Sequence, residues 1–191
     1  MDLKGKTAII TGSNSGIGYV LQVANGKVLK ISVDGEAFAA DSAGSHSRTL
    51  DLQQGVLSRH SEWQSQSGKQ LRIASRRFVS QANPHLMAIE LSITALKFSG
   101  EVILSSALDA AYPGFYKKDD PRVGEMAIAD SLTLLSQQFD NEHSLMLHRA
   151  KGADFIVAAA TSHLLPANAT LLAQDDSLPN KLTQQFALQL Q

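Results

Sequence analysis

Residues 71–96 read LRIASRRFVSQANPHLMAIELSITAL and contain two strand patterns separated by a break. In the first pattern Leu71 and Ile73 fall on one face of an extended chain, and Arg72 falls on the other. From Met87 onward, apolar residues again return at every second position. The Asn-Pro pair between the two patterns is a turn signal. This stretch therefore predicts two strands of an antiparallel sheet.

Strand patterns continue on both sides of this stretch. Residues 27–33 alternate and are followed by an Asp-Gly pair, which is a strong hairpin signal. Residues 55–64 and 101–109 are also strand-like, and a loop rich in Tyr, Pro, Lys and Asp follows at 111–124. Period-two pairs or triplets then return at Leu132 and Leu134, Leu145 and Leu147, Phe155 and Val157, and Phe186, Leu188 and Leu190. About a dozen short strands, with no helical pattern beyond about two turns, predict an all-β antiparallel sandwich.

The composition excludes several classes of function. The chain has 191 residues and a formal net charge of −1, with 17 basic and 18 acidic residues. This balance provides no electrostatic attraction to nucleic acid or to an anionic membrane. The chain has no cysteine, which excludes disulfides, thiolate zinc sites and cysteine nucleophiles. No apolar run approaches the roughly 20 residues that cross a bilayer, so we expect a soluble, cytoplasmic protein.

The opening residues 4–18, KGKTAIITGSNSGIG, carry a glycine-rich motif. A short apolar strand runs into a loop whose glycines let the backbone turn tightly and approach a pyrophosphate. The motif resembles the first strand and phosphate loop of the short-chain dehydrogenases/reductases, with their Thr-Gly-x-x-x-Gly-x-Gly pattern at Thr11, Gly12, Gly16 and Gly18. The resemblance implies binding of NAD or NADP at these four residues, as a fragment of an oxidoreductase.

The sequence after the glycine loop does not continue such a fold. A helix should follow, but residues 19–26 read YVLQVANG, with β-branched positions and a closing Asn-Gly. The catalytic Tyr-x-x-x-Lys of that family is also missing, because Tyr112 is followed four positions later by Tyr116. Hydride transfer would then lack its general acid or base. We therefore expect residues 1–21 to form an edge strand or a tail and expect no cofactor, and NAD(P) binding remains the alternative.

A second resemblance covers residues 22–191. Its pieces are ISVDGE at 31–36, RTLDLQQGVLSR at 48–59, Trp63 before a Ser-Gly turn at 67–68, ASRRFVS at 74–80, PHLMAIEL at 84–91, SSALD at 105–109 and a late strand at 182–190. In this order they resemble the N-terminal domain of glycoside hydrolase family 65, the maltose, trehalose and kojibiose phosphorylases. The resemblance implies a large β-sandwich of the super-sandwich type, which in the family sits on a catalytic (α/α)₆ barrel.

That barrel is absent from the sequence, so we expect a truncated domain. The resemblance implies that the barrel carries the general acid and the phosphate site of the family, and inverting chemistry needs both an acid and a nucleophile. We therefore expect no catalysis by the chain alone. The expected role is support of carbohydrate binding and of domain or subunit assembly, with the barrel and α-glucosides as partners. Apolar faces left bare by the missing barrel would favour self-association.

Individual side chains provide few candidate sites. The candidates for contact with a sugar or a partner are Trp63 and the loop residues Tyr112, Phe115 and Tyr116. For Trp63, the sole tryptophan, a buried position in the sheet is the favoured alternative, and for the loop it is solvation. Adjacent arginines at 76–77 must point to opposite faces of a strand, and we expect one to pair with a carboxylate. The six histidines show no metal-site spacing and no nucleophile elbow occurs, so we expect no catalytic residue and no metal.

Overall fold

The computed structural model describes residues 23–40, 44–83, 85–111, 132–151 and 155–191. These residues form strands, turns and loops, and they contain no α-helix and no helical barrel. The strands are β1 Asn25–Val33, β2 Glu36–Ala37, β3 Ser45–Asp51, β4 Val56–Gln64, β5 Gln70–Val79, β6 Met87–Ala95, β7 Gly100–Asp109, β8 Leu132–Asp140, β9 His143–Ala150, β10 Ile156–Ser162, β11 Ala169–Asp175 and β12 Lys181–Leu190. The all-β prediction is therefore confirmed.

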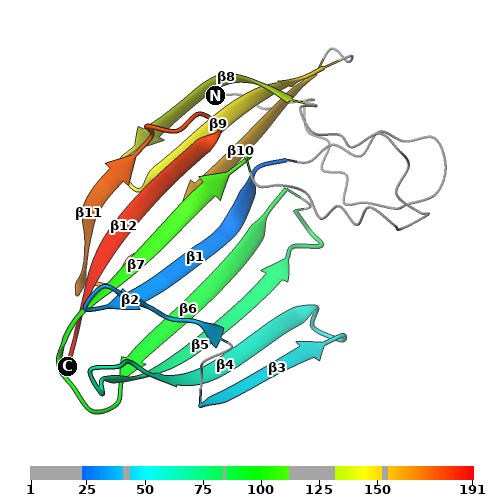
Figure 1. Cartoon of the computed structure of the whole chain (residues 1–191). Coiled ribbons are helices and arrows are strands. Elements are labelled where there is room, and N and C mark those ends of the chain that lie inside the picture. Colours follow the sequence, from blue (N-terminus) through cyan, green and yellow to red (C-terminus); the bar gives the residue numbers. More distant parts are fainter. Residues whose placement is uncertain (1–22, 41–43, 84, 112–131, 152–154) are drawn as a thin grey trace, which may run out of the picture. The chain divides into compact units, whose positions relative to one another are not determined.

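The strands form three sheets (Figure 1). Their orders are β3-β4-β5-β6, β10-β9-β8 and β11-β12-β7-β1-β2. In the first sheet every neighbouring pair is antiparallel, with Leu71 of β5 opposite Ala95 of β6. The two patterns in residues 71–96 are thus strands, as predicted, and the structure pairs them as neighbours. By its contacts the chain divides into two compact units, and the long strands contribute residues to both.

One unit comprises residues 29–105, 165–172 and 185–191. Its core joins Ile31 and Val33 of β1 to Trp63 of β4 and Leu71 of β5, together with Ile73 and Val102. Because side chains alternate across a strand, Glu62 of β4 and Arg72 of β5 lie on the opposite face of the sheet. Here the core is formed between the four-stranded sheet and strands of the five-stranded sheet.

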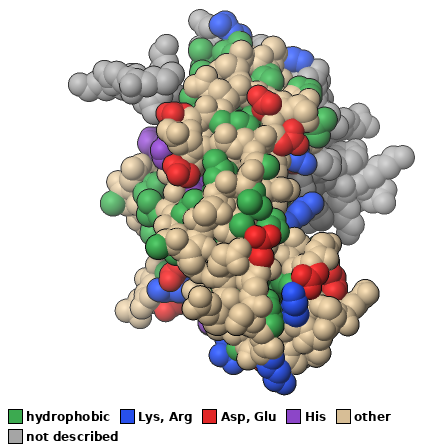
Figure 2. All heavy atoms as spheres, turned by 90° about the vertical axis from the view of Figure 1, so that its left-hand side faces the viewer, with side chains coloured by type: hydrophobic (Ala, Val, Ile, Leu, Met, Phe, Trp, Pro, Cys, Tyr) green, Lys and Arg blue, Asp and Glu red, His purple; other side chains and the backbone are tan. Residues whose placement is uncertain are grey.

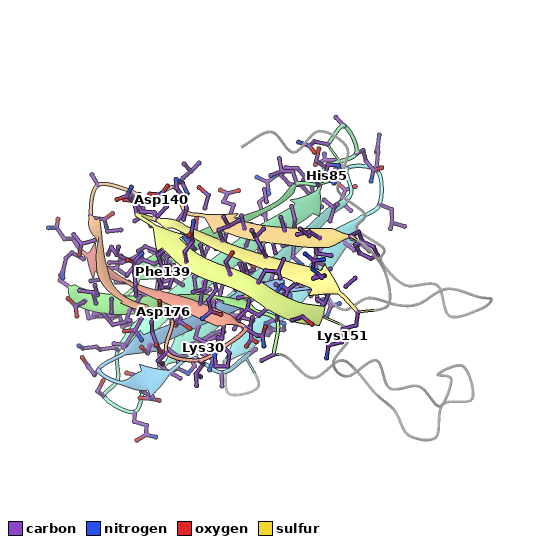
Figure 3. All side chains as sticks on the ribbon, turned by 90° about the horizontal axis from the view of Figure 1, so that it is seen from above. Lys30, His85, Phe139, Asp140, Lys151 and Asp176 are labelled. Carbon is purple, nitrogen blue, oxygen red and sulfur yellow. The ribbon has the colours of Figure 1, made fainter. Side chains whose placement is uncertain are left out.

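The described residues of the other unit are 23–28, 106–111, 132–151, 155–164 and 173–184. Its core contains Leu108 of β7, Met146 of β9 and Leu182 of β12, with Phe139 packed against them. The strands β8–β10 lie side by side in Figure 3, where Phe139 and Asp140 mark the end of β8. An additional residue bulges out of β8 between Leu134 and Ser136 and shifts the register with β9.

A buried polar network also stabilises the second unit. Gln184 is fully buried, and its side-chain oxygen accepts a hydrogen bond of 3.1 Å from the Ser144 hydroxyl. Its amide nitrogen donates to the backbone oxygen of Asn141 at 3.0 Å. His148, also buried, pairs with the side chain of Asn180 at 2.9 Å. Gln184, Ser144 and His148 therefore each have a hydrogen-bond partner, as their desolvation requires.

The turn predicted after residue 33 lies where the Asp-Gly pair placed it. Asp34 and Gly35 have φ of 52° and 80°, which is the geometry of a type I′ hairpin turn between β1 and β2. The Asp34 carboxylate also pairs with Lys69 at 2.8 Å, in the turn between β4 and β5. Asn141 has a φ of 53° in the turn between β8 and β9. Asn and Asp tolerate this left-handed conformation better than other non-glycine residues.

The sequence pattern did not predict two of the strands, β3 and β11. Both lie at the edge of a sheet. All seven residues of β3 are exposed, and so are six of the seven in β11. An edge strand that buries neither face has no apolar alternation, so period two carries no signal there. The residues quoted at 48–59 therefore include most of a strand that periodicity does not reveal.

The glycine-rich motif lies outside the described residues, and so does the expected edge strand or tail at 1–21. Within the described ranges, the alternation of strands and helices that a dinucleotide-binding fold requires is not found. None of the described segments forms a helix suited to crossing a membrane.

Candidate functional site

Trp63 lies in the core and away from solvent. It is 3% exposed, and its ring meets Phe38 edge to face with the centroids 6.1 Å apart. The alternation of β4 directs it inward together with Ser61, which is also buried. A sugar cannot stack on this ring while the packing is intact. The structure thus places Trp63 where the buried alternative expected it.

The other predicted contact residues cannot be placed. Tyr112, Phe115 and Tyr116 lie outside the described residues. Thr11, Gly12, Gly16 and Gly18 also lie outside them. Their proposed contacts therefore stay predictions.

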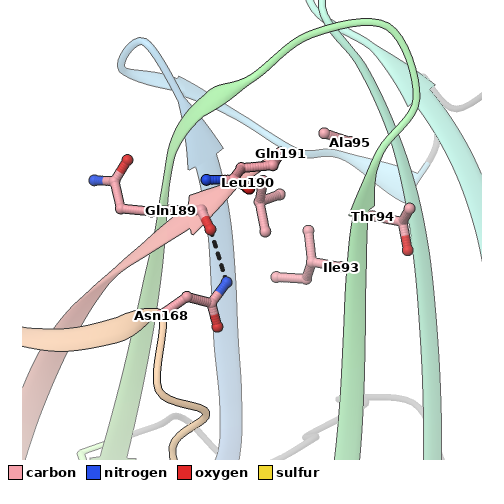
Figure 4. Close-up of a pocket in the computed structure, with 7 residues that line it drawn as sticks. All are labelled: Ile93, Thr94, Ala95, Asn168, Gln189, Leu190 and Gln191. Atoms are coloured by element: carbon pink, nitrogen blue, oxygen red, sulfur yellow. Dashed lines mark hydrogen bonds between the residues drawn. The ribbon is translucent and has the colours of Figure 1, made fainter.

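A shallow pocket lies within the first unit (Figure 4). It has a volume of about 360 Å³ and is lined by Ile93, Thr94, Ala95, Asn168, Gln189, Leu190 and Gln191. The Asn168 side chain donates to the Gln189 backbone oxygen at 2.7 Å, and the Gln189 amide donates to Glu101 at 3.0 Å. The lining side chains are aliphatic, amide or hydroxyl groups. Such groups can hydrogen-bond hydroxyls of a ligand, but they cannot serve as a general acid or base near neutral pH.

A serine–histidine pair occurs in the second unit. The Ser106 hydroxyl lies 2.8 Å from Nε2 of His163, and Nδ1 of the same ring lies 3.0 Å from the backbone oxygen of Glu142. Since a carbonyl only accepts, Nδ1 carries a proton, and in the tautomer with Nε2 unprotonated the Ser106 hydroxyl donates to Nε2. This is the pairing of an activated nucleophile. However, Ser106 is 4% exposed, so a substrate cannot approach its oxygen, and the pair is structural.

The adjacent arginines point to opposite faces of β5, as predicted. Arg76 is exposed and pairs with Glu90 of β6 at 3.4 Å. Arg77 is half-buried on the other face, and burial lowers its pKa, as do the positive charges of Arg59 and Arg48. The strand register brings these three arginines together on one face. We call Arg48, Arg59 and Arg77 the arginine cluster.

The sequence reading missed Arg48 and Arg59. Their positions become meaningful only when β3 is paired with β4, since Arg48 lies directly opposite Arg59. The sequence does carry a sign of Arg59, because it lies an even number of residues from Leu57 and Trp63 and so falls on the apolar face of β4. An arginine in such a phase is unusual on a buried face.

The described residues hold no group of three His, Cys, Asp or Glu side chains that could bind a metal ion. The face shown in Figure 2 carries acidic and basic side chains interspersed with hydrophobic ones. A mixed surface of this kind has no extended field to attract a polyanion.

Comparison with known proteins identifies related sequences over nearly the whole chain. The family model for the glycosyl hydrolase family 65 N-terminal domain matches residues 7–191. This match begins before Thr11, so it includes the glycine-rich motif, and the comparisons do not support the resemblance to a dehydrogenase.

Three curated relatives illustrate the similarity. The α,α-trehalose phosphorylase of Thermoanaerobacter brockii is 28% identical over 151 residues, which are 78% of this chain and 20% of that protein. An uncharacterized glycosyl hydrolase of Mycobacterium tuberculosis is 32% identical over 160 residues, 79% of this chain and 20% of that protein. The kojibiose phosphorylase of Escherichia coli is 38% identical over 82 residues, 43% of this chain and 11% of that protein. The chain thus spans about a fifth of the length of the first two relatives.

Proposed function

We infer the function of this chain from its family, since it belongs to the N-terminal domains of glycosyl hydrolase family 65. We propose that it is the non-catalytic domain of an α-glucoside phosphorylase or hydrolase. In this role it supports carbohydrate binding and the assembly of domains or subunits, and a catalytic barrel domain is its partner.

The observation that carries the proposal is the extent of the match. The family model spans residues 7–191, while the matched region is only 20% of the trehalose phosphorylase. Four fifths of that protein therefore have no counterpart in this chain. This proportion fits a protein in which the matched domain has a supporting role and the remaining four fifths of the chain carry out catalysis.

The chemistry of the described residues is consistent with a supporting role. Inverting cleavage of a glycoside needs a general acid whose pKa is raised toward neutrality. The Asp175 carboxyl is an opposite case, because hydrogen bonds from Ser177 lower its pKa. We also propose that the chain acts without a nicotinamide cofactor and in the cytoplasm.

The pocket at residues 93–95, 168 and 189–191 is the proposed place of carbohydrate contact. The Asn168 amide lies there with the aliphatic side chains of Ile93 and Leu190, and sugars present hydroxyls beside apolar C–H faces. An open pocket of this size suits weak binding of one or two sugar rings, with no step of catalysis.

An activity assay tests the non-catalytic part of the proposal. The purified chain is incubated with trehalose, kojibiose or maltose and inorganic phosphate, and the release of glucose and sugar phosphate is measured. We expect no turnover above buffer. Phosphate-dependent cleavage of any of the three disaccharides would show that the proposal is wrong.

Calorimetry tests the binding part. We expect weak binding of at least one disaccharide, which Asn168→Ala reduces several-fold. Gln53→Ala is the matched control, since Gln53 is an exposed amide residue in the turn between β3 and β4. Heats indistinguishable from dilution for every disaccharide, or equal losses in the control, would rule out the pocket as the binding place.

A further inference from the structure

The arginine cluster is created by the register of three strands. Arg48 of β3 lies directly opposite Arg59 of β4, and Arg59 lies opposite Ser75 of β5. Arg77 is two residues further along β5, on the same face as Ser75. Directly opposed residues have Cβ atoms about 5 Å apart, and diagonal neighbours about 7–8 Å. Three guanidinium groups on side chains of this length can therefore converge on one ligand.

The two faces of this sheet differ in how their arginines are neutralised. On one face Arg72 pairs with Glu62 at 2.8 Å, and Arg76 pairs with Glu90 at 3.4 Å. The cluster lies on the other face, where the register places apolar residues and small hydroxyl groups around it. These neighbours are Leu50, Leu57, Ser61, Ile73, Ser75, Ile89 and Leu91. His46 lies opposite Ser61 on the same face, and its ring contacts the Ser61 hydroxyl at 2.7 Å. In the described part of the sheet, this face carries three cations and no carboxylate.

The cluster has unused hydrogen-bonding capacity. The Nε atom of Arg59 is buried and makes no hydrogen bond within the described residues. A buried donor without a partner is costly, and natural structures rarely leave one unsatisfied. Burial lowers the pKa of Arg77, and the charges of Arg59 and Arg48 lower it further. An anion placed among the three side chains would satisfy the donor and relieve the repulsion.

The cluster is also accessible from the edge of the sheet. Every residue of β3 is exposed, including Arg48. Arg59 and Arg77 are half-buried, so their side chains are partly desolvated but still reach solvent. A ligand can thus enter beside β3 and meet donors that are held by packing.

We propose that Arg48, Arg59 and Arg77 form a binding site for a phosphate group, carried by inorganic phosphate or by a sugar phosphate. A guanidinium binds phosphate with two parallel hydrogen bonds, and a phosphate dianion has oxygens enough for more than one such fork. A single carboxylate would neutralise only one of the three charges. The Ser75 hydroxyl, on the same face, supplies a further donor.

This inference does not depend on the proposed function, because it rests on the sheet register and not on the family. The two proposals can also be tested apart, since phosphate binding is measured with no disaccharide present. The result of the disaccharide activity assay does not bear on the phosphate site. Absence of phosphate binding would not contradict the supporting role.

The test is calorimetric titration of the full chain with inorganic phosphate at pH 7.5 and low salt, with potassium chloride of equal ionic strength as the blank. We expect saturable binding of one phosphate per chain. Arg59→Gln and Arg77→Gln should weaken it at least tenfold. Arg72→Gln and Arg76→Gln are matched controls on the opposite face of the same strand, and they should bind as the original chain does.

Two further arms sharpen the result. Titration with glucose 1-phosphate distinguishes the sources, because tighter binding than inorganic phosphate assigns the site to a sugar phosphate. Phosphate should also raise the melting temperature of the original chain, since a ligand that binds the folded state stabilises it. If Arg59→Gln does not fold, Arg48→Gln at the exposed edge takes its place. Absence of saturable phosphate binding, or equal losses in the opposite-face controls, would overturn the inference.

Discussion

Trp63 shows how one side chain can support two opposite interpretations. The sole tryptophan of a carbohydrate-related domain suggests sugar stacking, while its place in an alternating strand suggests burial. In the structure it is 3% exposed and contacts Phe38. Its fluorescence therefore reports the packing of the first unit.

We predict that Trp63 is a stability residue. Trp63→Ala should lower the free energy of unfolding by about 3–5 kcal/mol, since a large buried aromatic leaves a cavity that the core cannot close. Urea unfolding of the variant measures this loss. In the original chain, emission should be blue-shifted and unchanged by disaccharides.

Phe78→Ala serves as the control for this prediction. Phe78 is 43% exposed, so its loss should cost far less than that of Trp63. A red-shifted native emission, or quenching by a disaccharide, would contradict the buried position.

Asp175 provides a prediction about pH. The Ser177 side chain and then its backbone N–H donate to the carboxylate, and both lower its pKa in the folded chain. A lowered folded pKa adds stability above the unfolded pKa, and this stability is lost as the pH falls through the folded pKa. Ser177→Ala should therefore raise the carboxyl pKa toward its ordinary value, as NMR titration of Asp175 can measure. Ser58→Ala, in the other unit, should leave the midpoint unchanged, and an unchanged midpoint in Ser177→Ala would refute the assignment.

The strands differ in how clearly they can be predicted from their sequences. Central strands such as β4 and β5 each bury one face, and Trp63 of β4 and Leu71 and Ile73 of β5 fall on that face at period-two positions. The edge strands β3 and β11 are almost wholly exposed, and their sequences show no such period. Arg48 went unrecognised for this reason, since a site that spans an edge strand depends on a pairing that periodicity does not report.

The β1–β2 hairpin depends on its turn. Gly35 has a φ of 80°, and nothing lies near the position of an added Cβ, so a substitution there meets backbone strain only. We predict that Gly35→Ala lowers the free energy of unfolding by about 1 kcal/mol. Gly44→Ala is the control, because its added Cβ meets the Glu62 backbone oxygen at an ordinary 3.8 Å. Equal effects of the two variants in urea unfolding would contradict the turn assignment.

For the whole molecule, a patch of apolar side chains has consequences for association. Within the first unit, Leu50, Leu52, Val79 and Met87 are 58%, 84%, 57% and 38% exposed. They belong to the ends of neighbouring strands and the turn after β3, so the register gathers them at one end of the four-stranded sheet. Exposed patches of this kind mark interaction surfaces.

We predict that the isolated chain self-associates through this end of the sheet. Light scattering should show a mass that rises with concentration, and Leu52→Asp together with Val79→Thr should restore the monomer. Leu164→Asp is the control, because Leu164 is fully exposed and belongs to the other unit. A monomer at all concentrations in the original chain would count against the prediction.

Circular dichroism with a thermal melt tests the fold and the absence of a cofactor together. We predict a β-dominated spectrum and a melting temperature that neither NAD nor NADP changes, since a ligand of the folded state must raise it. Helical minima, or a higher melting temperature with either cofactor, would instead indicate that the glycine-rich motif at 11–18 binds a nicotinamide cofactor.

Much of this fold follows from the local sequence, without knowledge of which segments pair. Alternation in β1, β4, β5 and β6 predicted the strands, because each of them buries one face. The Asp-Gly pair predicted its turn because few residues adopt a positive φ. The parity of Arg76 and Arg77 placed them on opposite faces of one strand. Each of these predictions needs only neighbours along the chain.

Other features required the pairing of distant segments. The partners of the buried Gln184 come from β9 and from the turn before it, about 40 residues away. The arginine cluster exists because β3 and β5 flank β4 in one register, and a slip of one residue would move Arg59 to the other face. Alternation states which residues share a face of one strand. Which strands lie side by side, and in what register, depends on long-range pairing that no local pattern contains.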